Sequence, residues 1–572
     1  MVKKLLKYMK GYGKECALGP LFKMLEATFE LLIPLVVASI IDTGIGNGDH
    51  GHIVNMCLVM VLLGVVGLAC AVTAQYFAAR AAVGFAAKVR RGLMHHVLHL
   101  SYTEIDRVGT STIITRMTSD INQVQNGVNL TIRLLLRSPF VVFGAMVMAF
   151  TIDAQAALIF AGVIPVLCVV VFGIVLITMP AYRGVQEKLD GVTAATRENL
   201  AGVRVLRAFC KEEAETDEFR EKTDGLYQKQ LFAGRISNLL NPLTLVIINI
   251  AVILLIRVGA MKVELGVLTQ GMVVALYNYM SQILVELIKM VNLIINITKA
   301  VACGNRIQAV LEIPLPAENA ENKTLEGKVE FCNVTAKYAG AAEPSLENIS
   351  FTALPGQTVG VIGSTGSGKS TLIQLIPKLY EAVSGQVLVD GVDVAFLSRE
   401  MLCRQVGIVP QNAVLFKGTI RENLLWGNEN ATEEEMKDAL KIAQALTFVE
   451  EKGLDAPVEE GGANFSGGQR QRLTIARALV GGPKILILDD STSALDYVTD
   501  AALRKALKAM ENAPTTFVVS QRAASVRHAD KILVLEDGVL VGNGTHSELL
   551  DSCQVYREIC QSQGTGEGCS NG

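Results

Sequence analysis

Residues 358–371 read TVGVIGSTGSGKST, and this stretch decides the fold of the second half of the chain. A β-branched run leads into a glycine-rich loop ending in Gly-Lys-Ser, and the apolar segment TLIQLIPKLY (371–380) has the composition of a helix. Strand, loop and helix in this order are the context that a phosphate-binding loop requires. The backbone N–H groups of the loop and the helix dipole would then bind phosphate oxygens. The sequence therefore predicts a nucleotide site.

The loop supplies a contiguous set of expected nucleotide contacts. Lys369 would neutralise the β and γ phosphates, and the Ser370 hydroxyl would bind Mg²⁺. The full set is Gly363, Ser364, Thr365, Gly366, Ser367, Gly368, Lys369, Ser370 and Thr371.

The first half of the chain has a different composition. The 572 residues are 50% hydrophobic and 19% charged, with a mean hydropathy of +0.38, which is too apolar for an ordinary soluble enzyme of this length. A bilayer-crossing helix needs about 20 apolar residues. Six segments are long enough, at about 16–41, 54–79, 129–151, 156–179, 238–260 and 267–292. The sequence thus predicts an all-α transmembrane domain of six long helices.

The connections between these segments alternate in length and charge. The first, third and fifth are short, whereas the second (80–128) and fourth (180–237) are long, basic and rich in helix formers. Lys and Arg gather on the cytoplasmic side of membrane proteins. The richness in helix formers predicts that the long loops extend the membrane helices. The Lys/Arg bias places the long loops and the N-terminus in the cytoplasm. It also accounts for the basic residues without nucleic-acid binding.

The composition changes again at 313–328, a polar and proline-bearing linker. Beyond it, β-branched runs alternate with helical patterns: KVEFCNV (328–334), TVGVIG, QVGIVP (405–410), KILILDD, TTFVVS (515–520) and KILVLEDG (531–538). This alternation is typical of an α/β domain with a mainly parallel sheet. We predict a transmembrane domain at 1–312, a linker at 313–328, an α/β P-loop NTPase domain with a helical subdomain at 329–562, and a flexible tail at 563–572.

Two further motifs accompany the phosphate loop. The apolar run ILILDD (485–490) brings Asp489 to the end of a buried strand, where a carboxylate would hold Mg²⁺. FSGGQRQR (465–472) places small residues and backbone amides at the start of a helix, which is a second anion site.

Because the chain carries FSGGQ as well as a phosphate loop, its soluble half resembles the nucleotide-binding domain of an ABC transporter. The whole chain resembles a half-transporter of the exporter fold. In that family two nucleotide domains stack head to tail, and each ATP lies between one phosphate loop and the other domain's signature motif. The resemblance thus implies a second half-transporter as partner, and it assigns Ser466, Gly467, Gly468 and Gln469 to the partner's ATP.

The resemblance also implies further roles by position. Tyr338 matches the aromatic residue that stacks on adenine. Gln411 matches a glutamine that touches Mg²⁺ and water. Asp496, with Ser493, matches a loop that crosses the dimer interface, and Glu460 matches an acid that contacts the cytoplasmic loops. Segments near 101–112 and 195–208 would be the coupling helices.

At two positions the sequence departs from the family pattern. Asp490 follows Asp489 where a catalytic glutamate is usual, and its carboxylate should stop about 1.5 Å short of the usual reach. Gln521, in VVSQR (518–522), replaces a histidine that contacts the γ-phosphate, and an amide cannot relay a proton as imidazole can. Both changes affect hydrolysis and leave ATP binding intact.

These departures predict an asymmetric heterodimer in the bacterial plasma membrane. The ATP site of this chain would hydrolyse ATP slowly. Its intact signature motif would complete an efficient catalytic site in a partner that carries the glutamate and the histidine. The expected function is ATP-driven export of a small or amphipathic, multidrug-type substrate. The alternatives are a homodimer with two slow sites or a lipid flippase, an importer of siderophores with the exporter fold, and an ATP-gated channel or regulator.

Charged residues within the spans are candidates for function. Glu26 and Glu30 share one helix face, and Glu30 could line a cavity for cationic substrates or pair with Arg or Lys. Glu286 and Lys289 are three residues apart and are expected to pair with each other.

Overall fold

The computed structural model describes residues 2–316, 325–338, 340–491 and 493–563. The chain divides into two compact units, Met1–Leu98 with Thr110–Ile313, and His99–Gly109 with Pro314–Gly572. The predicted flexible tail lies outside the described residues, except for residue 563, and so does the middle of the predicted linker.

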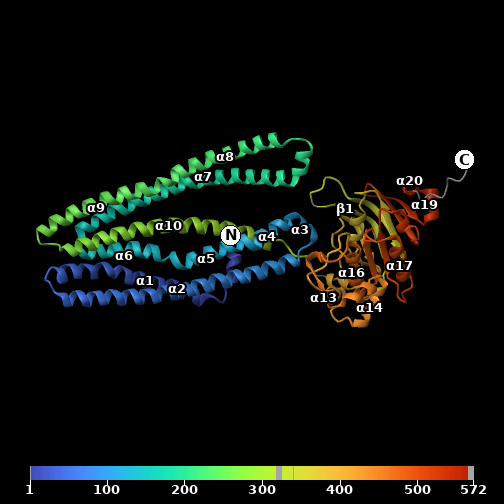
Figure 1. Ribbon diagram of the computed structural model, residues 1–572, viewed down its shortest axis with the longest axis horizontal. Helices are drawn as coiled ribbons and strands as arrows, with labels where there is room; N and C mark the ends of the chain where they lie inside the picture. Colours follow the sequence, from blue (N-terminus) through green and yellow to red (C-terminus); the bar gives the residue numbers. More distant parts are fainter. Residues whose placement is uncertain (1, 317–324, 339, 492, 564–572) are drawn as a thin grey trace. The chain divides into compact units, whose positions relative to one another are not determined.

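The first unit is entirely helical (Figure 1). Its helices are η1 (Val2–Met9), α1 (Gly13–Ser39), η2 (Ile40–Ile45), α2 (His50–Leu98), α4 (Thr110–Thr115), η3 (Arg116–Asp120), α5 (Ile121–Leu134), α6 (Arg137–Ile152), α7 (Ala154–Ala208), α8 (Glu212–Asn238), α9 (Leu240–Glu264) and α10 (Gln270–Leu311).

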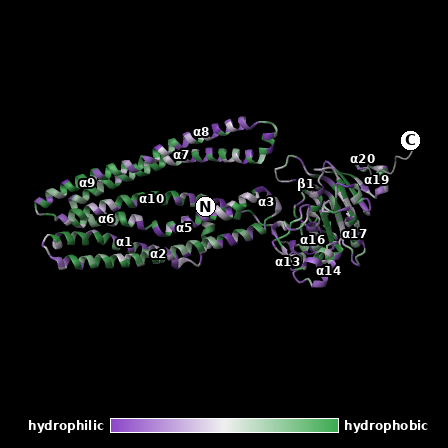
Figure 2. Cartoon of the chain, viewed as in Figure 1, coloured by the Kyte–Doolittle hydropathy of each residue, from purple (hydrophilic) through white to green (hydrophobic). Residues whose placement is uncertain are grey.

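Six helical stretches among the described residues are long and apolar enough to cross a membrane, which confirms the predicted number of spans. Several run far beyond the ~30 Å of a bilayer's hydrocarbon core. The 49 residues of α2, for example, extend over about 70 Å. Figure 2 shows hydrophilic colour concentrated in α8 and the adjoining part of α7, whereas α6 and α9 are mainly hydrophobic. The long loops are thus helical extensions of the spans, as expected.

Among its described residues, the second unit contains three sheets and a group of helices. Its strands are β1 (Val329–Ala336), β2 (Leu346–Ala353), β3 (Thr358–Gly363), β4 (Ser384–Val389), β5 (Val392–Asp393), β6 (Val406–Val409), β7 (Gly418–Thr419), β8 (Pro457–Val458), β9 (Ile485–Asp489), β10 (Thr515–Val519), β11 (Lys531–Glu536) and β12 (Val539–Gly544). Its helices are α3 (Tyr102–Val108), α11 (Lys369–Leu375), α12 (Arg399–Gln405), α13 (Ile420–Leu425), α14 (Glu433–Ile442), α15 (Leu446–Lys452), η4 (Glu460–Gly462), α16 (Gly467–Val480), α17 (Tyr497–Lys508), α18 (Ala523–Val526), α19 (His546–Ser552) and α20 (Gln554–Ser562).

The main sheet has the strand order β12-β11-β3-β10-β9-β6, and all its strands are parallel except the edge strand β12. The α/β fold with a mainly parallel sheet is therefore confirmed. Every residue of β9 and β10 is buried, which explains their continuous apolar runs. Helices α13 to α16 form the helical subdomain, and their buried side chains share one hydrophobic core with residues of α17, β9 and β10.

One predicted strand belongs to a different sheet. The segment KVEFCNV forms most of β1, which pairs antiparallel with β2 and β4 in a four-stranded sheet. Its alternation of buried and exposed residues suits a strand with one solvated face.

Candidate nucleotide site

The predicted site residues meet at one edge of the main sheet. The phosphate loop follows β3, Gln411 follows β6, Asp489 ends β9, and Gln521 follows β10. These four strands run parallel, so their carboxyl ends face the same side. Ligands of open α/β sheets bind at this edge.

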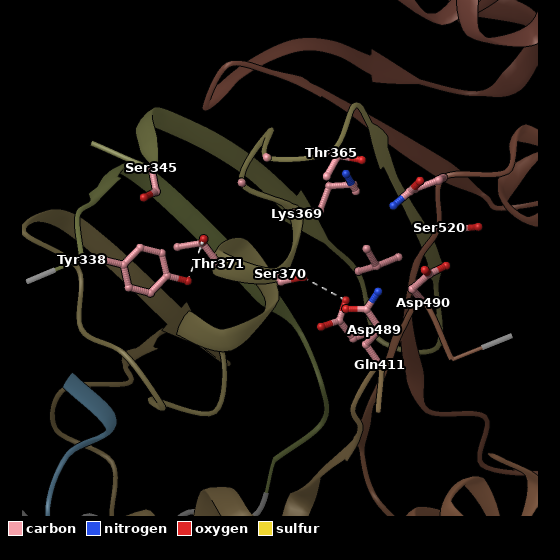
Figure 3. A pocket seen from close by; sticks show the side chains of 14 residues that line it. Tyr338, Ser345, Thr365, Lys369, Ser370, Thr371, Gln411, Asp489, Asp490 and Ser520 are labelled. Atoms are coloured by element: carbon pink, nitrogen blue, oxygen red, sulfur yellow. Dashed lines mark hydrogen bonds between the residues drawn. The ribbon is translucent and has the colours of Figure 1, made fainter. Parts of the chain in front are cut away.

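A cavity of about 300 Å³ lies at this edge (Figure 3). It is lined by Tyr338, Ser345, Thr365, Gly366, Gly368, Lys369, Ser370, Thr371, Gln411, Asp489, Asp490, Val519, Ser520 and Gln521. The cavity thus unites the phosphate loop with the expected adenine contact, the expected Mg²⁺ ligands and both altered catalytic positions.

The conformation of the phosphate loop requires glycine at Gly368. This residue precedes α11 with a φ of 93°, in the left-handed region that favours glycine. A Cβ atom there would lie 2.5 Å from the carbonyl oxygen of Ser345. The loop is therefore fixed both by backbone conformation and by close packing.

Lys369 is held inside its own loop. Its Nζ donates to the carbonyl oxygen of Gly363 at 2.9 Å and to that of Ser364. Burial lowers the pKa of Lys369, and the nearby Asp490 and Asp489 carboxylates act against that shift. An anionic phosphate oxygen would favour the charged ammonium in the same way.

The expected Mg²⁺ ligands are in contact. Ser370 Oγ donates a hydrogen bond to Asp489 Oδ1 at 3.1 Å, and Gln411 extends beside them (Figure 3). Hydroxyl, carboxylate and amide oxygens are the hard ligands that Mg²⁺ prefers, so this set fits the ion. Burial raises the pKa of Asp489, and the neighbouring Asp490 raises it further.

Tyr338 lies on the opposite side of the cavity. Its hydroxyl is 3.0 Å from Thr371 Oγ1, and its ring packs edge-on against the ring of Tyr380, with centroids 5.1 Å apart. The residue is half-buried and lines the cavity, where an aromatic ring could stack on a ligand.

Asp490 and Gln521 complete the cavity where hydrolysis would occur. Asp490 has a φ of 46°, a left-handed conformation that aspartate tolerates better than most residues. Burial raises the pKa of its carboxyl, although Arg522 and a hydrogen bond from Gln411 lower it. Gln521 is exposed, and its backbone oxygen accepts a hydrogen bond from Gln563.

The signature residues lie away from this cavity. Ser466 caps α16: its Oγ accepts from the Gln469 N–H, and Gln469 Oε1 accepts from the Ser466 N–H at 3.0 Å. Ser466 and Gly467 are exposed, and none of residues 466–469 is among the described residues that line the cavity. They lie at the start of a 14-residue helix, an end whose dipole favours an anion.

The remaining predicted residues have local structural roles. Asp496 caps α17 by accepting from the Thr499 N–H and hydroxyl, each at 2.9 Å. Ser493 Oγ donates to the backbone oxygen of Asp490 at 2.8 Å, so it steadies the turn after β9. Glu460 is exposed at the start of η4.

Ser345 is a lining residue that the sequence did not indicate. Its carbonyl oxygen packs against Gly368, 23 residues away along the chain, and no local sequence motif indicates this contact. Val519 and Ser520, which precede Gln521 in the chain, also line the cavity.

Of the first expected coupling segment, 101–112, residues 101–109 belong to the second unit and 110–112 to the first. Ser101 caps α3, and Asp106 Oδ2 accepts a hydrogen bond from the Tyr380 hydroxyl at 2.6 Å. The ring of Tyr102 lies 6.1 Å from that of Tyr380. Tyr380 therefore contacts both α3 and the expected adenine-stacking Tyr338. The second expected segment, 195–208, is the end of α7.

Comparison with known proteins agrees with this geometry. Residues 16–287 match the family model of the ABC transporter transmembrane region, and residues 346–493 match the ABC transporter family model. The chain is 37% identical over 569 residues to an ABC transporter ATP-binding protein of Mycobacterium tuberculosis, covering 98% of this chain and 97% of that protein. It is 36% identical over 571 residues to the ABC transporter ATP-binding protein YfiB of Bacillus subtilis, covering 99% of each.

A more distant relative is a fatty acid ABC transporter ATP-binding/permease protein of Mycobacterium bovis, 32% identical over 82% of this chain and 74% of that protein. In structure, the chain is similar to a bacterial Atm1-family ABC exporter with ATP bound, with a TM-score of 0.80 and 22% identity, covering 97% of this chain and 99% of that one. The chain therefore belongs to the ABC transporter family: it is a multi-pass membrane protein of the exporter fold and an ATPase whose activity is coupled to transport.

Proposed function

We propose that this chain is the catalytically weak subunit of a heterodimeric exporter in the bacterial plasma membrane. It would move a small or amphipathic substrate outward. Its nucleotide domain and N-terminus would lie in the cytoplasm, on the side where its long basic loops belong. Its partner would be a half-transporter that carries a glutamate and a histidine where this chain has Asp490 and Gln521.

One observation carries the proposal: a single cavity combines complete binding groups with altered catalytic groups. Tyr338, Lys369, Ser370 and Asp489 line that cavity and would hold ATP with Mg²⁺. Asp490 shares that cavity but carries a short carboxylate in a restrained backbone conformation. A base that stops about an ångström short of the attacking water loses about a hundredfold in rate.

The exposed signature motif supports the second half of the proposal. Ser466 and Gly467 lie exposed at the start of α16, outside the chain's own cavity. In a head-to-tail dimer they would bind the γ-phosphate of ATP held by the partner. This chain would thus keep one ATP and help the partner to hydrolyse the other.

The deciding experiment compares ATPase rates of the chain alone and with its partner subunit. We expect slow turnover alone and at least tenfold faster turnover in the pair. We also expect Asp490→Glu combined with Gln521→His to raise the rate of the chain alone about tenfold or more. Fast hydrolysis by the isolated wild-type chain, unchanged by the double substitution, would refute the proposal.

Direction of transport is tested separately in vesicles of known orientation. ATP-dependent loss of substrate from the compartment that contains the nucleotide domains supports export. Accumulation on that side would indicate import.

A further inference from the structure

A second cavity, of about 390 Å³, lies within the helical unit. It is formed by α1, α6 and α10, and it is lined by Glu30, Ile33, Pro34, Val141, Asn278, Ser281, Gln282, Val285 and Glu286. Apolar side chains make up one part of its wall and amides, a hydroxyl and two carboxylates the other. Such a mixture suits an amphipathic ligand.

Two carboxylates of this cavity are anchored by one guanidinium. Arg137, only 6% exposed, donates to Glu286 Oε1 and to Glu30 Oε2, each at 2.6 Å. Lys289 also donates to Glu286 Oε1, at 2.8 Å, which confirms the predicted pair. The prediction for Glu30 left a cation partner and a cavity wall as alternatives, and the residue has both. The two acids line the cavity, whereas neither Arg137 nor Lys289 is among its described lining residues.

Two buried acceptor atoms in this wall have no hydrogen-bond donor among the described residues. Glu286 is 2% exposed, and its Oε2 has no hydrogen-bond partner among the described residues, although Oε1 has two. Gln282 Oε1, one helical turn away on α10, is likewise buried and without a partner there. A buried acceptor left unsatisfied costs about 1–3 kcal/mol, and more when it is charged. Both atoms therefore need hydrogen-bond donors.

We propose that this cavity binds the protonated primary amine of an amphipathic substrate. The ammonium supplies several N–H donors to Glu286 Oε2 and Gln282 Oε1, and the apolar body packs against Ile33, Pro34 and Val141. A carboxylate or a quaternary ammonium cannot donate such bonds. The proposal rests on the transport function above and names the substrate class.

The probe is radiolabelled dodecylamine, bound without ATP to the purified full-length chain in nanodiscs of phosphatidylcholine and phosphatidylglycerol, with empty nanodiscs as background. Dodecyltrimethylammonium, 1-dodecanol and dodecanoate share the chain length and differ in the head group. We expect dodecylamine to bind at least tenfold more tightly than any of them. Equal binding of the alcohol, the quaternary amine or the fatty acid would overturn the proposal.

Two substitutions on α10 form a matched pair. Gln282→Leu removes one acceptor, and we expect it to weaken dodecylamine binding about tenfold. Gln308 is also a half-buried glutamine with a partnerless Oε1, but it does not line the cavity, so Gln308→Leu should leave binding unchanged. Equal effects of the two substitutions would contradict the site. Glu286→Gln should weaken binding further wherever the variant still folds.

Two further measurements identify the source of the amine and separate this inference from the proposed function. Competition by added phosphatidylethanolamine would identify a lipid headgroup as the source of the amine, and its absence would identify a soluble amphiphile; both support the amine site. Because binding is measured without ATP, intact amine binding with no ATP-driven transport would refute the proposed function alone. Loss of amine selectivity with intact transport would refute this inference alone.

Discussion

Asp489 and Asp490 are adjacent acids with different surroundings. Asp489 ends a fully buried strand and accepts from Ser370, whereas Asp490 begins a turn and is less buried. Burial raises the pKa of each, so both resist ionisation more than an exposed aspartate does. A bound Mg²⁺ would reverse that effect at Asp489, because a cation favours the carboxylate.

This coupling predicts a pH dependence of Mg²⁺-assisted ATP binding. The raised pKa of Asp489 means that its carboxylate is lost at a higher pH than usual as the solution is acidified. Since Mg²⁺ requires the ionised form, affinity should fall by about tenfold per pH unit once the pH is below that pKa. The measurement is the binding of a fluorescent ATP analogue between pH 8 and pH 5, with and without Mg²⁺.

Asp489→Asn is the control for protonation of the nucleotide itself. The variant should gain little from Mg²⁺ at any pH, and its affinity should change less with pH than that of the wild type. If both proteins show the same pH slope, Asp489 is not the titrating ligand.

Helices and strands that are encoded by a contiguous sequence pattern could be predicted from the sequence. The β3–loop–α11 unit was recognisable because its strand, glycines and helix are contiguous, and the six spans because each is a continuous apolar run. Contacts between segments that are far apart in the chain have no contiguous sequence pattern, so they could not be predicted. The carbonyl oxygen of Ser345 packs on Gly368, and Arg137 meets Glu30 and Glu286 from 107 and 149 residues away.

The contact between α3 and Tyr380 gives a prediction at this scale. Tyr380→Phe removes the hydrogen bond to Asp106 but keeps the ring that packs against Tyr338. Because the Asp106 carboxylate is exposed, losing this hydrogen bond should cost only about 1 kcal/mol of interaction free energy. We expect substrate stimulation of ATPase activity to fall about fivefold, with the KM for ATP within twofold of wild type.

Tyr102→Phe is the matched control, because only a ring contact with Tyr380 is described for Tyr102 and phenylalanine preserves it. It should leave stimulation unchanged. A parallel rise in KM and loss of basal rate in Tyr380→Phe would instead indicate damage to the ATP cavity.

In the membrane unit as a whole, ion pairs connect helices that are far apart in the chain. Arg137 at the start of α6 binds acids of α1 and α10, so one side chain links three of the predicted spans. Two buried charges in such a pair cost desolvation energy that their attraction offsets only while both remain. The network therefore determines which helices pack together, even where its net contribution to stability is small.

The buried pair of Arg137 and Glu286 predicts an asymmetric thermodynamic cycle. Arg137→Met leaves the buried Glu286 with Lys289 alone and should lower the free energy of unfolding by about 3 to 5 kcal/mol, whereas Arg137→Met with Glu286→Met should recover much of that loss. Thermal and denaturant unfolding of the chain in detergent measures both. Lys222→Met, which breaks an exposed pair with Glu218 on α8, should produce no resolvable change. Additive losses in the double variant would show that Arg137 stabilises the fold by packing alone. Recovery would show that the charges are retained for a function other than stability, as expected if Glu286 receives the substrate.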